Sequence, residues 1–452
     1  MSAVTVTRPG VASRPARVAR GYRFELVKLL AQWRVRLLFA LCWLGPAVLV
    51  AVVGQQDSLP ADTVFGRWMG QTGWAGSLVG LAASGTFVLP LVTALVAGDV
   101  FAAEDRLGTW GHLLVAVRSP RRIFVAKALA SLTVLLLLLA GLPVSSIAGG
   151  LATVGDHPLV GLDGHLLGSG DAAVAVLLAW AAALAPTLAF AAVGWLGSVA
   201  FGRSPLGLVL PALLALLLQV AQILPLPVVV RAALPTYAFV AWHGLFTDPV
   251  QAGPIVVGVV VALAWAAAAA ALAYRLFMRR DFTDVAFDGA GRGIVLGAVA
   301  PLAALLAVTV GVLAAATSAT GSGVDKAKLD ASLATAFAHL YRLQTAELHR
   351  PEVTEAQLAT SASCDKGGSL VDDVGPGNDW RCVVTWHLPG ARATGSAIYQ
   401  LDVTPDGRYA ADGDGPQAVN GFFQVRTPTG DAANPLWQFD GSVDLLTSTS
   451  KG

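Results

Sequence analysis

Residues 99–127 read DVFAAEDRLGTWGHLLVAVRSPRRIFVAK, and this polar stretch interrupts two long apolar runs. Four large apolar residues within it follow one another at spacings of three, four and three, which places them on one face of a helix. They are Leu107, Trp110, Leu114 and Val117. Ser119-Pro120 then predicts the start of a new helix, because serine is a good N-cap and proline is tolerated in the first turn. We expect a short amphipathic helix, a break and the beginning of a membrane span.

Basic side chains gather on the same stretch. They are Arg106, Arg118, Arg121 and Arg122. Short cytoplasmic loops of membrane proteins collect Lys and Arg, so the stretch is predicted to be a cytoplasmic hairpin between two spans. The alternative is a solvated loop whose arginines only set the topology.

The composition of the whole chain is that of a membrane protein. Of its 452 residues, 55% are hydrophobic and only 13% are charged. A helix needs roughly 20 apolar residues to cross about 30 Å of hydrocarbon. Seven stretches have this character: 36–54, 76–98, 123–150, 172–201, 205–224, 252–277 and 293–316. The expected fold class is an all-α polytopic membrane protein with about seven transmembrane helices and a small α+β extracytoplasmic domain at its C-terminus.

The hairpin also carries an ordered set of polar and basic features. They are Glu104, Gly108-Thr109, Leu113-Leu114, Pro120-Arg121-Arg122 and Lys127. This order resembles the signature of the ABC-2 type permeases, the membrane subunits of one class of ATP-driven exporters. One departure is the order Ser119-Pro120, since the family more often shows Pro before a Ser-Arg pair.

The resemblance implies that the hairpin, together with the helix before the first span, contacts a separate ATPase. The apolar face would dock into a groove on that partner, with Trp110 as its first anchor and with Glu104 and Arg118 setting the register by charge pairing. The residues expected to couple are Glu104, Leu107, Gly108, Thr109, Trp110, Leu113, Leu114, Val117, Arg118 and Arg121, with Phe24, Leu29 and Trp33 as second-rank contacts. The alternative is that this face simply lies on the inner leaflet.

The predicted organisation follows from where the charges lie along the chain. It comprises a disordered basic cytoplasmic tail at 1–20, an amphipathic interfacial helix at 21–35, a six-span permease-like region at 36–280, a seventh span at 293–316 and an extracytoplasmic domain at 317–452. The expected outer loops carry few basic residues, which favours a multi-pass protein of the cell membrane with its N-terminus in the cytoplasm.

Residues 225–251 are too apolar for an ordinary loop and too interrupted by proline for a straight span. They predict short outer helices packed against the bundle, because backbone at membrane depth must be covered by protein. ABC-2 permeases place a pair of short outer helices at the corresponding point. The alternative is an aromatic belt of Tyr237, Trp242 and Phe246 at the outer headgroups.

The C-terminal tail predicts a helix at 325–349 followed by strands at 381–388, 396–411 and 422–425, with a turn at Pro405-Asp406-Gly407. An oxidising compartment would let Cys364 and Cys382 form a disulfide, and the alternative is two buried free thiols. Cys42, within the first span, is expected to be a small apolar packing residue. No paired cysteine or histidine spacing predicts a metal site.

Two absences bear on the mechanism. The central turns of the expected spans carry no Asp, Glu, Lys or Arg, which counts against an ion-coupled carrier. The sequence also contains no G-x-x-x-x-G-K-[ST] phosphate loop. We therefore expect no enzymatic site and no cofactor in this chain, with ATP and Mg held by a partner ATPase dimer.

Six family spans are too few for a complete pathway, so a second permease half, identical or homologous, is expected to line it as well. The polar residues Thr86, Thr93, Gln219 and Gln222 are candidates for that pathway. Each is alternatively a helix-packing contact. No nucleic-acid partner is expected, and the lipid bilayer is the remaining one.

Two functions compete on this evidence. The first is the permease subunit of an ATP-driven ABC exporter, coupled through the 99–122 hairpin. The second is a membrane scaffold that displays an extracytoplasmic binding or sensing domain. An enzyme in the tail is a weaker third possibility, because His349, Asp402 and Asp406 show no spacing typical of a catalytic constellation.

Overall fold

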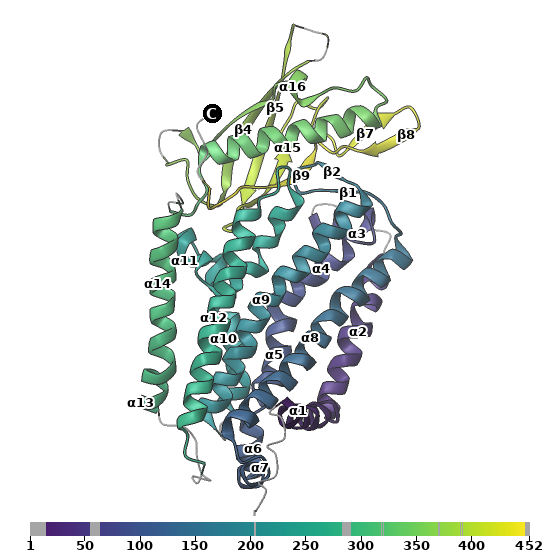
Figure 1. The fold of residues 1–452 in the computed structure, drawn as a ribbon. Helices are drawn as coiled ribbons and strands as arrows, with labels where there is room; N and C mark the ends of the chain where they lie inside the picture. The colour runs from purple at the N-terminus through teal and green to yellow at the C-terminus, as the bar shows by residue number, and fades with distance from the viewer. Residues whose placement is uncertain are drawn as a thin grey trace, which may run out of the picture.

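A computed structural model describes residues 15–54, 64–202, 205–282, 291–317, 319, 321–368, 371–388, 390 and 392–447. Helices dominate the chain and form an elongated bundle, and a small sheet domain lies at one end of it (Figure 1). Most of the expected disordered tail, residues 1–14, lies outside the described residues. The remainder, 15–20, is already helical, so the expected tail is shorter than predicted.

Five helices of the described chain are long and apolar enough to cross a membrane. They are α2 (Trp33–Gly54), α8 (Pro120–Thr153), α9 (Ser169–Phe201), α12 (Ala252–Arg279) and the run Gly291–Ala316, which comprises α13 (Gly291–Ile294), η4 (Val295–Val299) and α14 (Ala300–Ala316). These helices make the chain a membrane protein, but the expected count of seven spans is not confirmed.

The other two expected spans are not single helices long enough to cross a membrane, and the reason differs between them. The stretch at 76–98 is divided into α4 (Gly76–Ala83), the π-helical η1 (Ser84–Val88) and α5 (Leu89–Ala97), which follow one another without a gap. The other is α10 (Leu206–Ile223), whose apolar part, Gly207–Ile223, is shorter than the other spans. Both still lie within the bundle, since α10 packs against α9 and α5.

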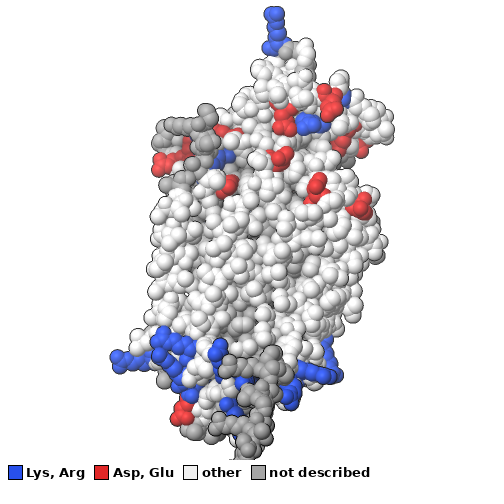
Figure 2. Space-filling model, in the orientation of Figure 1, with Lys and Arg blue, Asp and Glu red and all other residues white. Residues whose placement is uncertain are grey.

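The amphipathic helix α1 (Pro15–Leu30) lies across the end of the bundle opposite the sheet domain, beside α6 (Ala102–Leu107) and α7 (Trp110–Val117) (Figure 1). It ends five residues before the predicted boundary, and α2 begins after a turn. Figure 2 shows Lys and Arg gathered at this end, whereas most Asp and Glu side chains in that view lie at the sheet-domain end. On this face, the two ends of the molecule therefore differ in the sign of their predominant charge.

The hairpin that interrupts the spans consists of two short helices, not one. They are α6 (Ala102–Leu107) and α7 (Trp110–Val117). Gly108 between them has a φ of 66°, a left-handed conformation that ends α6. The single face expected for Leu107, Trp110, Leu114 and Val117 is therefore wrong, because Leu107 belongs to a different helix. The start of α8 at Pro120, with Ser119 as its extended N-cap residue, is confirmed.

The opposite end of the bundle is capped by short elements. They are α3 (Val64–Gln71), the hairpin of β1 (Leu159–Val160) and β2 (Leu166–Leu167), α11 (Val228–Ala232), and the 3-10 helices η2 (Pro235–Phe239) and η3 (Ala241–Phe246). The last three occupy the proline-interrupted segment, where short helices were expected. Trp242 and Phe246 are fully buried there, so they are packing residues and not an exposed aromatic belt.

The sheet domain has one helix packed on a five-stranded antiparallel sheet of order β3-β4-β5-β6-β9. The strands are β3 (Ser361–Asp365), β4 (Gly377–His387), β5 (Thr394–Val403), β6 (Arg408–Gly413) and β9 (Gln438–Ser442). The other elements are α15 (Lys326–Glu347), α16 (Glu355–Leu358), and a small hairpin of β7 (Gln424–Thr427) and β8 (Gly430–Ala433). The expected α+β domain and its turn before Arg408 are confirmed.

The core of this domain follows from the alternation of side chains along the strands. Trp380, Tyr399 and Leu401 point inward and are fully buried, and Phe337 of α15 packs on them from above. Cys364 and Cys382 are direct partners in β3 and β4 and form the predicted disulfide. Cys42 is buried in α2, as expected.

One buried arginine joins the domain to the bundle. Arg231 of α11 is 1% exposed and donates to the carbonyls of Leu226 at 3.2 Å and Ser322 at 2.9 Å. It also donates to the carbonyl of Pro405 in the sheet domain. Apolar residues of α11, η2 and η3 and of the sheet domain form one continuous cluster around this point. The domain is therefore docked on the end of the bundle opposite α1.

Candidate coupling site

A buried ion cluster ties three helices together at the basic end of the bundle. Lys127 of α8 donates to Glu25 of α1 at 3.0 Å and to Glu104 of α6 at 2.7 Å. Lys28 of α1 and the hydroxyl of Thr109 also donate to Glu104. The side chains of Lys127 and Glu104 are 1% and 2% exposed. Each buried charge therefore has a partner of opposite sign, which is the condition for burying it.

The same cluster decides the ionisation of Glu104. Burial alone would raise the pKa of this carboxyl, but the charge of Lys127 and hydrogen bonds from Lys127, Lys28 and Thr109 lower it to about 2. Glu104 is thus a carboxylate across the physiological range. Its role is internal, whereas the sequence suggested charge pairing with a partner protein.

A second ion cluster holds the base of the hairpin. Asp99, which precedes α6, accepts from Arg34 of α2 at 2.6 Å and also from Arg106 of α6. Asp105 accepts from Arg280, which follows α12, at 2.9 Å. The hairpin is therefore bound to the ends of two spanning helices as well as to α1 and α8.

Trp110 faces the interior of the protein. Its indole N–H donates to Asp105 at 2.8 Å, and its ring centroid lies 5.5 Å from that of Phe277 and 5.4 Å from that of Phe282. The guanidinium of Arg280 lies 5.8 Å from the same ring centroid. Only 6% of Trp110 is exposed, so it fastens the hairpin to α12 and offers no surface to a partner in this structure. The expectation that Trp110 is the first docking anchor is therefore corrected.

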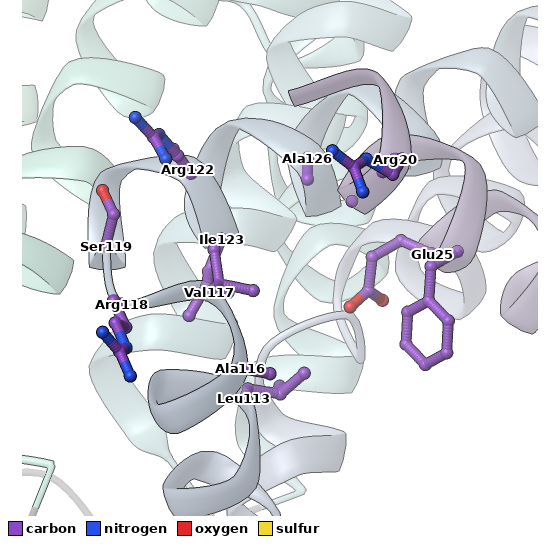
Figure 3. A pocket seen from close by; sticks show the side chains of 12 residues that line it. Arg20, Glu25, Leu113, Ala116, Val117, Arg118, Ser119, Arg122, Ile123 and Ala126 are labelled. Carbon is purple, nitrogen blue, oxygen red and sulfur yellow. The ribbon is translucent and has the colours of Figure 1, made fainter. Parts of the chain in front are cut away.

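A groove of about 700 Å³ opens between α1 and the hairpin (Figure 3). Its apolar lining includes Leu113 and Val117 of α7 and Ile123 of α8. Arg118 and Arg122 lie along one side, and Arg20 and Glu25 of α1 lie on the other. The groove thus combines an apolar floor with basic edges.

The other expected coupling residues differ in how accessible they are. Leu107, Gly108, Arg118 and Arg121 are exposed, and Thr109, Leu113, Leu114 and Val117 are half-buried. Phe24 and Trp33 are 60% and 76% exposed, whereas Leu29 is buried. Val115, 75% exposed on α7, was missed because it falls off the face assigned from the sequence. Among these residues, the accessible apolar surface is therefore carried by Phe24, Trp33, Leu107 and Val115.

Among the described side chains, no hydrogen bond joins the expected pathway residues to one another. Thr93 is buried and donates to the Pro90 carbonyl of its own helix at 2.7 Å, which fits the helix-packing alternative. Gln222 is buried and donates to the Arg231 carbonyl at 3.1 Å and to the Thr236 hydroxyl at 3.0 Å. Gln219 is half-buried, and the side chain of Thr86, in η1, lies outside the described part.

Sequence reasoning missed the partners of the cluster but had a signal for them. Lys127 was singled out only as the last feature of the hairpin signature, and Glu25 is a lone acidic residue on a basic helix. A Lys and a Glu on two separate helices are ordinarily both exposed at the protein surface. Only the tertiary fold of this chain buries them together. Comparison with known proteins adds no name to this arrangement: no family model matches the chain, and no curated protein is found to be similar to it.

Proposed function

We propose that this chain is the membrane-spanning permease subunit of an ATP-driven ABC exporter and that a separate ATPase docks on the α1–α7 groove. The observation that carries the proposal is the groove itself, with exposed apolar side chains beside it at the basic end of the bundle. Exposed apolar residues next to a concave surface are typical of protein–protein contact sites. The resemblance of the hairpin to the ABC-2 signature supplies the kind of partner.

The groove suits a helix of the partner. An α-helix with its side chains is about 10–12 Å across, and a groove lined by Leu113, Val117 and Ile123 would receive its apolar face. Arg118 and Arg122 would pair with acidic residues of that helix. This reverses the arrangement expected from the sequence, since the concave surface belongs to this chain and the inserted element to the ATPase.

The buried ion cluster would carry the movement of the ATPase into the membrane. Lys127 joins α1 and α6 to the start of α8, so a displacement of the hairpin cannot leave α8 unaffected without breaking buried ion pairs. The helix α8 has 34 residues, which at 1.5 Å per residue is about 50 Å. It therefore runs from the docking surface to the opposite end of the bundle.

The remaining features of the proposal concern topology and assembly. The basic end of the bundle would lie in the cytoplasm, and the sheet domain with its disulfide would lie outside the cell. The run α4–η1–α5 and α10 would complete seven spans. A second permease half would share the pathway, and ATP and Mg would be bound by the ATPase pair.

Co-purification tests this proposal. The full-length chain, extracted from its native membranes, is expected to bring a P-loop ATPase with it. Ala116→Asp and Phe24→Asp, at two exposed residues of the groove lining, are expected to lose at least tenfold of that ATPase. Burying an unpaired carboxylate in an apolar contact costs well over the 1.4 kcal/mol that a tenfold loss requires. Leu166→Asp is the matched control, because Leu166 is 59% exposed on the outer hairpin.

The same experiment also tests the competing function. Recovery of cell-envelope proteins and no ATPase would favour a scaffold that displays the sheet domain. Unchanged ATPase recovery in both groove variants would instead place the ATPase contact elsewhere on the chain.

A further inference from the structure

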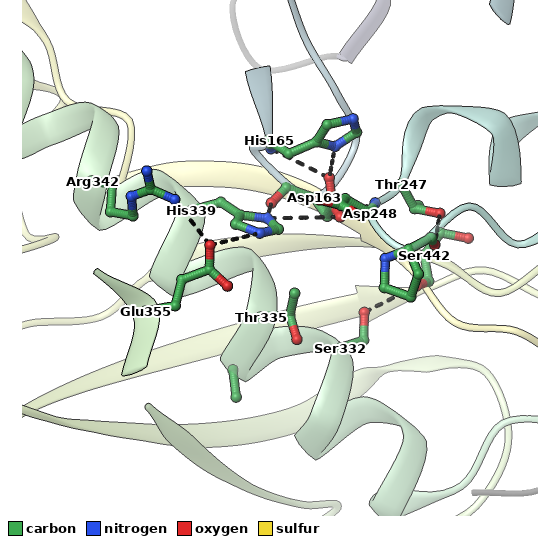
Figure 4. A network of polar contacts seen from close by, with 12 residues as sticks. Asp163, His165, Thr247, Asp248, Ser332, Thr335, His339, Arg342, Glu355 and Ser442 are labelled. Atoms are coloured by element: carbon green, nitrogen blue, oxygen red, sulfur yellow. Dashed lines mark hydrogen bonds and ion pairs between the residues drawn. The ribbon is translucent and has the colours of Figure 1, made fainter. Parts of the chain in front are cut away.

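A network of two histidines and two carboxylates lies where the sheet domain meets the outer hairpin (Figure 4). Asp163, in the turn between β1 and β2, is its centre. Its carboxylate accepts from His165 Nδ1 at 2.5 Å and from the backbone N–H of Asp248 at 2.6 Å. Its main-chain carbonyl accepts from Nδ1 of His339, on α15, at 3.0 Å. One buried residue therefore connects two outer segments of the bundle to the sheet domain.

Both ring nitrogens of His339 face oxygen atoms that can accept a hydrogen bond. Nδ1 must carry a proton, because the Asp163 carbonyl that it contacts cannot donate. Nε2 lies 3.5 Å from Oε1 of Glu355, on α16. A neutral imidazole has only one N–H, so in that form a nitrogen lone pair faces a carboxylate. The imidazolium form can donate from both nitrogens and is the better fit to this setting.

Charged groups of both signs surround His339. The Asp163 carboxylate lies 3.7 Å from His339 Nδ1, and Glu355 adds a second negative charge. Arg342 opposes them, but it pairs with Glu355 at 3.0 Å and lies 3.8 Å from Glu352. His165 is the other titratable group, with its ring centroid 6.1 Å from that of His339. Asp248, in the segment between η3 and α12, lies beside Asp163 and donates its backbone N–H to it.

Asp163 stays ionised in this environment. Burial alone would raise the pKa of its carboxyl, but the hydrogen bonds from His165 and from the Asp248 backbone, with the nearby histidine charges, lower it. His339 is 7% exposed, so its interaction with Asp163 is only weakly screened. The half-exposed Glu355 contributes less for the opposite reason.

We propose that this network is a proton-responsive joint, in which protonation of His339 tightens the packing of the sheet domain on the outer hairpin. Imidazole is the side chain that ordinarily changes charge between about pH 5 and 8. The joint is thus tighter in mildly acidic surroundings than in mildly alkaline ones. This inference does not depend on the transport function, because it concerns only the contact between the domain and the bundle.

Hydrogen–deuterium exchange of the full-length protein in lipid nanodiscs tests the joint. The readout is amide protection of the outer hairpin, 159–167, at pH 5.5 and pH 8.0, after correction for the intrinsic exchange rate. A charge-assisted hydrogen bond is about twice as strong as a neutral one, so we expect about fivefold more protection at the lower pH. His339→Gln keeps a donor but cannot be charged, and its protection ratio is expected to fall well below that of the wild type, with any remaining difference owed to His165.

Two further variants separate the joint from general effects of pH on the domain. Glu355→Gln removes one carboxylate from the exposed side of the network, and the protection ratio is expected to fall below that of the wild type. His387→Gln, at the exposed last residue of β4, is expected to keep the wild-type ratio. Equal protection of the wild-type hairpin at both pH values, or a wild-type ratio in His339→Gln, would overturn the proposal.

Discussion

At the scale of single residues, an almost completely buried lysine holds the hairpin in place. Lys127 is 1% exposed and lies between Glu25 and Glu104, which come from helices on either side of it. A buried ion pair contributes little net stability over an apolar substitute, but removal of one partner leaves an uncompensated charge. Its role is therefore to fix which helices are neighbours, and its loss is costly.

Lys127→Met tests this role. We expect the substitution to lower the free energy of unfolding by about 3–5 kcal/mol, because it leaves two carboxylates buried with only Lys28 to neutralise them. Thermal unfolding in detergent with a helix-sensitive signal measures the change. Arg381→Met, which breaks an exposed ion pair with Asp414, is the control and is expected to cost about 0–1 kcal/mol. A loss for Lys127→Met no larger than that of the control would contradict the assignment.

Glu104 makes the stability of the bundle depend on pH with a definite sign. Its pKa is about 2 in the folded protein, below its value of 4.5 when unperturbed. A carboxyl with a lowered pKa stabilises the folded state above the unfolded pKa, and this contribution is lost as the pH falls through the folded pKa. We expect unfolding midpoints of the wild type to fall between pH 4.5 and 2, and to fall less steeply for Glu104→Gln. Identical pH profiles would refute this.

At the scale of elements, one glycine separates the two helices of the hairpin. Gly108 has a φ of 66° and no heavy atom within reach of an added Cβ, so an alanine there meets no clash and only backbone strain. Gly111, inside α7, is equally unobstructed but has no positive φ. Alanine substitutions at the two positions therefore separate the effect of backbone conformation from the effect of side-chain packing.

Gly108→Ala is expected to destabilise the hairpin by about 1 kcal/mol, because a left-handed residue with a side chain is unfavourable. Gly111→Ala is expected to have the opposite sign, a gain of about 0.5–1 kcal/mol from helix propensity. Amide hydrogen exchange of residues 102–117 measures both effects as changes in the free energy of local unfolding. Destabilisation by both variants would show that packing, and not backbone conformation, controls the hairpin.

Short sequence patterns predicted the positions of helices and turns better than they predicted which residues share one apolar helix face. The helix start at Ser119-Pro120, the amphipathic helix before the first span, the C-terminal helix and the turn before Arg408 all follow from short patterns and are present. The apolar face assigned to the hairpin was wrong, because one left-handed residue rotates α7 relative to α6. A spacing rule cannot include such a break unless the glycine is recognised as a helix end.

The candidate site was predictable in location but not in its contacts. Charge clustering and the hairpin signature pointed to the stretch that lines part of the groove. Trp110 nevertheless faces inward, because Phe277, Phe282 and Arg280 form its environment. These residues lie more than 150 positions along the chain from it. Likewise, Lys127 and Glu25 are 102 residues apart, and nothing local pairs them.

At the scale of the whole molecule, charge and disulfide chemistry both distinguish the two ends of the bundle. Lys and Arg gather around α1, α6 and α7, and the disulfide lies in the sheet domain at the other end. Cytoplasmic loops are rich in basic residues, and disulfides persist in oxidising compartments. The two observations are independent and indicate the same orientation.

Labelling of single introduced cysteines in intact cells tests that orientation. We expect Leu166→Cys, on the outer hairpin, to react with a membrane-impermeant thiol reagent, and Val115→Cys, on α7, to react only after lysis. Both side chains are highly exposed in the native chain, and the only free cysteine among the described residues, Cys42, is buried. The reverse pattern would invert the topology and place the groove outside the cell.

We propose that an ATPase occupies the groove between α1 and α7, and site-specific photo-cross-linking in native membranes can detect that contact. A photoreactive amino acid at Ala116, an exposed residue of the groove lining, is expected to form an adduct with a P-loop ATPase. The same probe at Leu166 is expected to form none. Cross-links from Ala116 only to lipid, or to the ATPase equally from both positions, would contradict the claim.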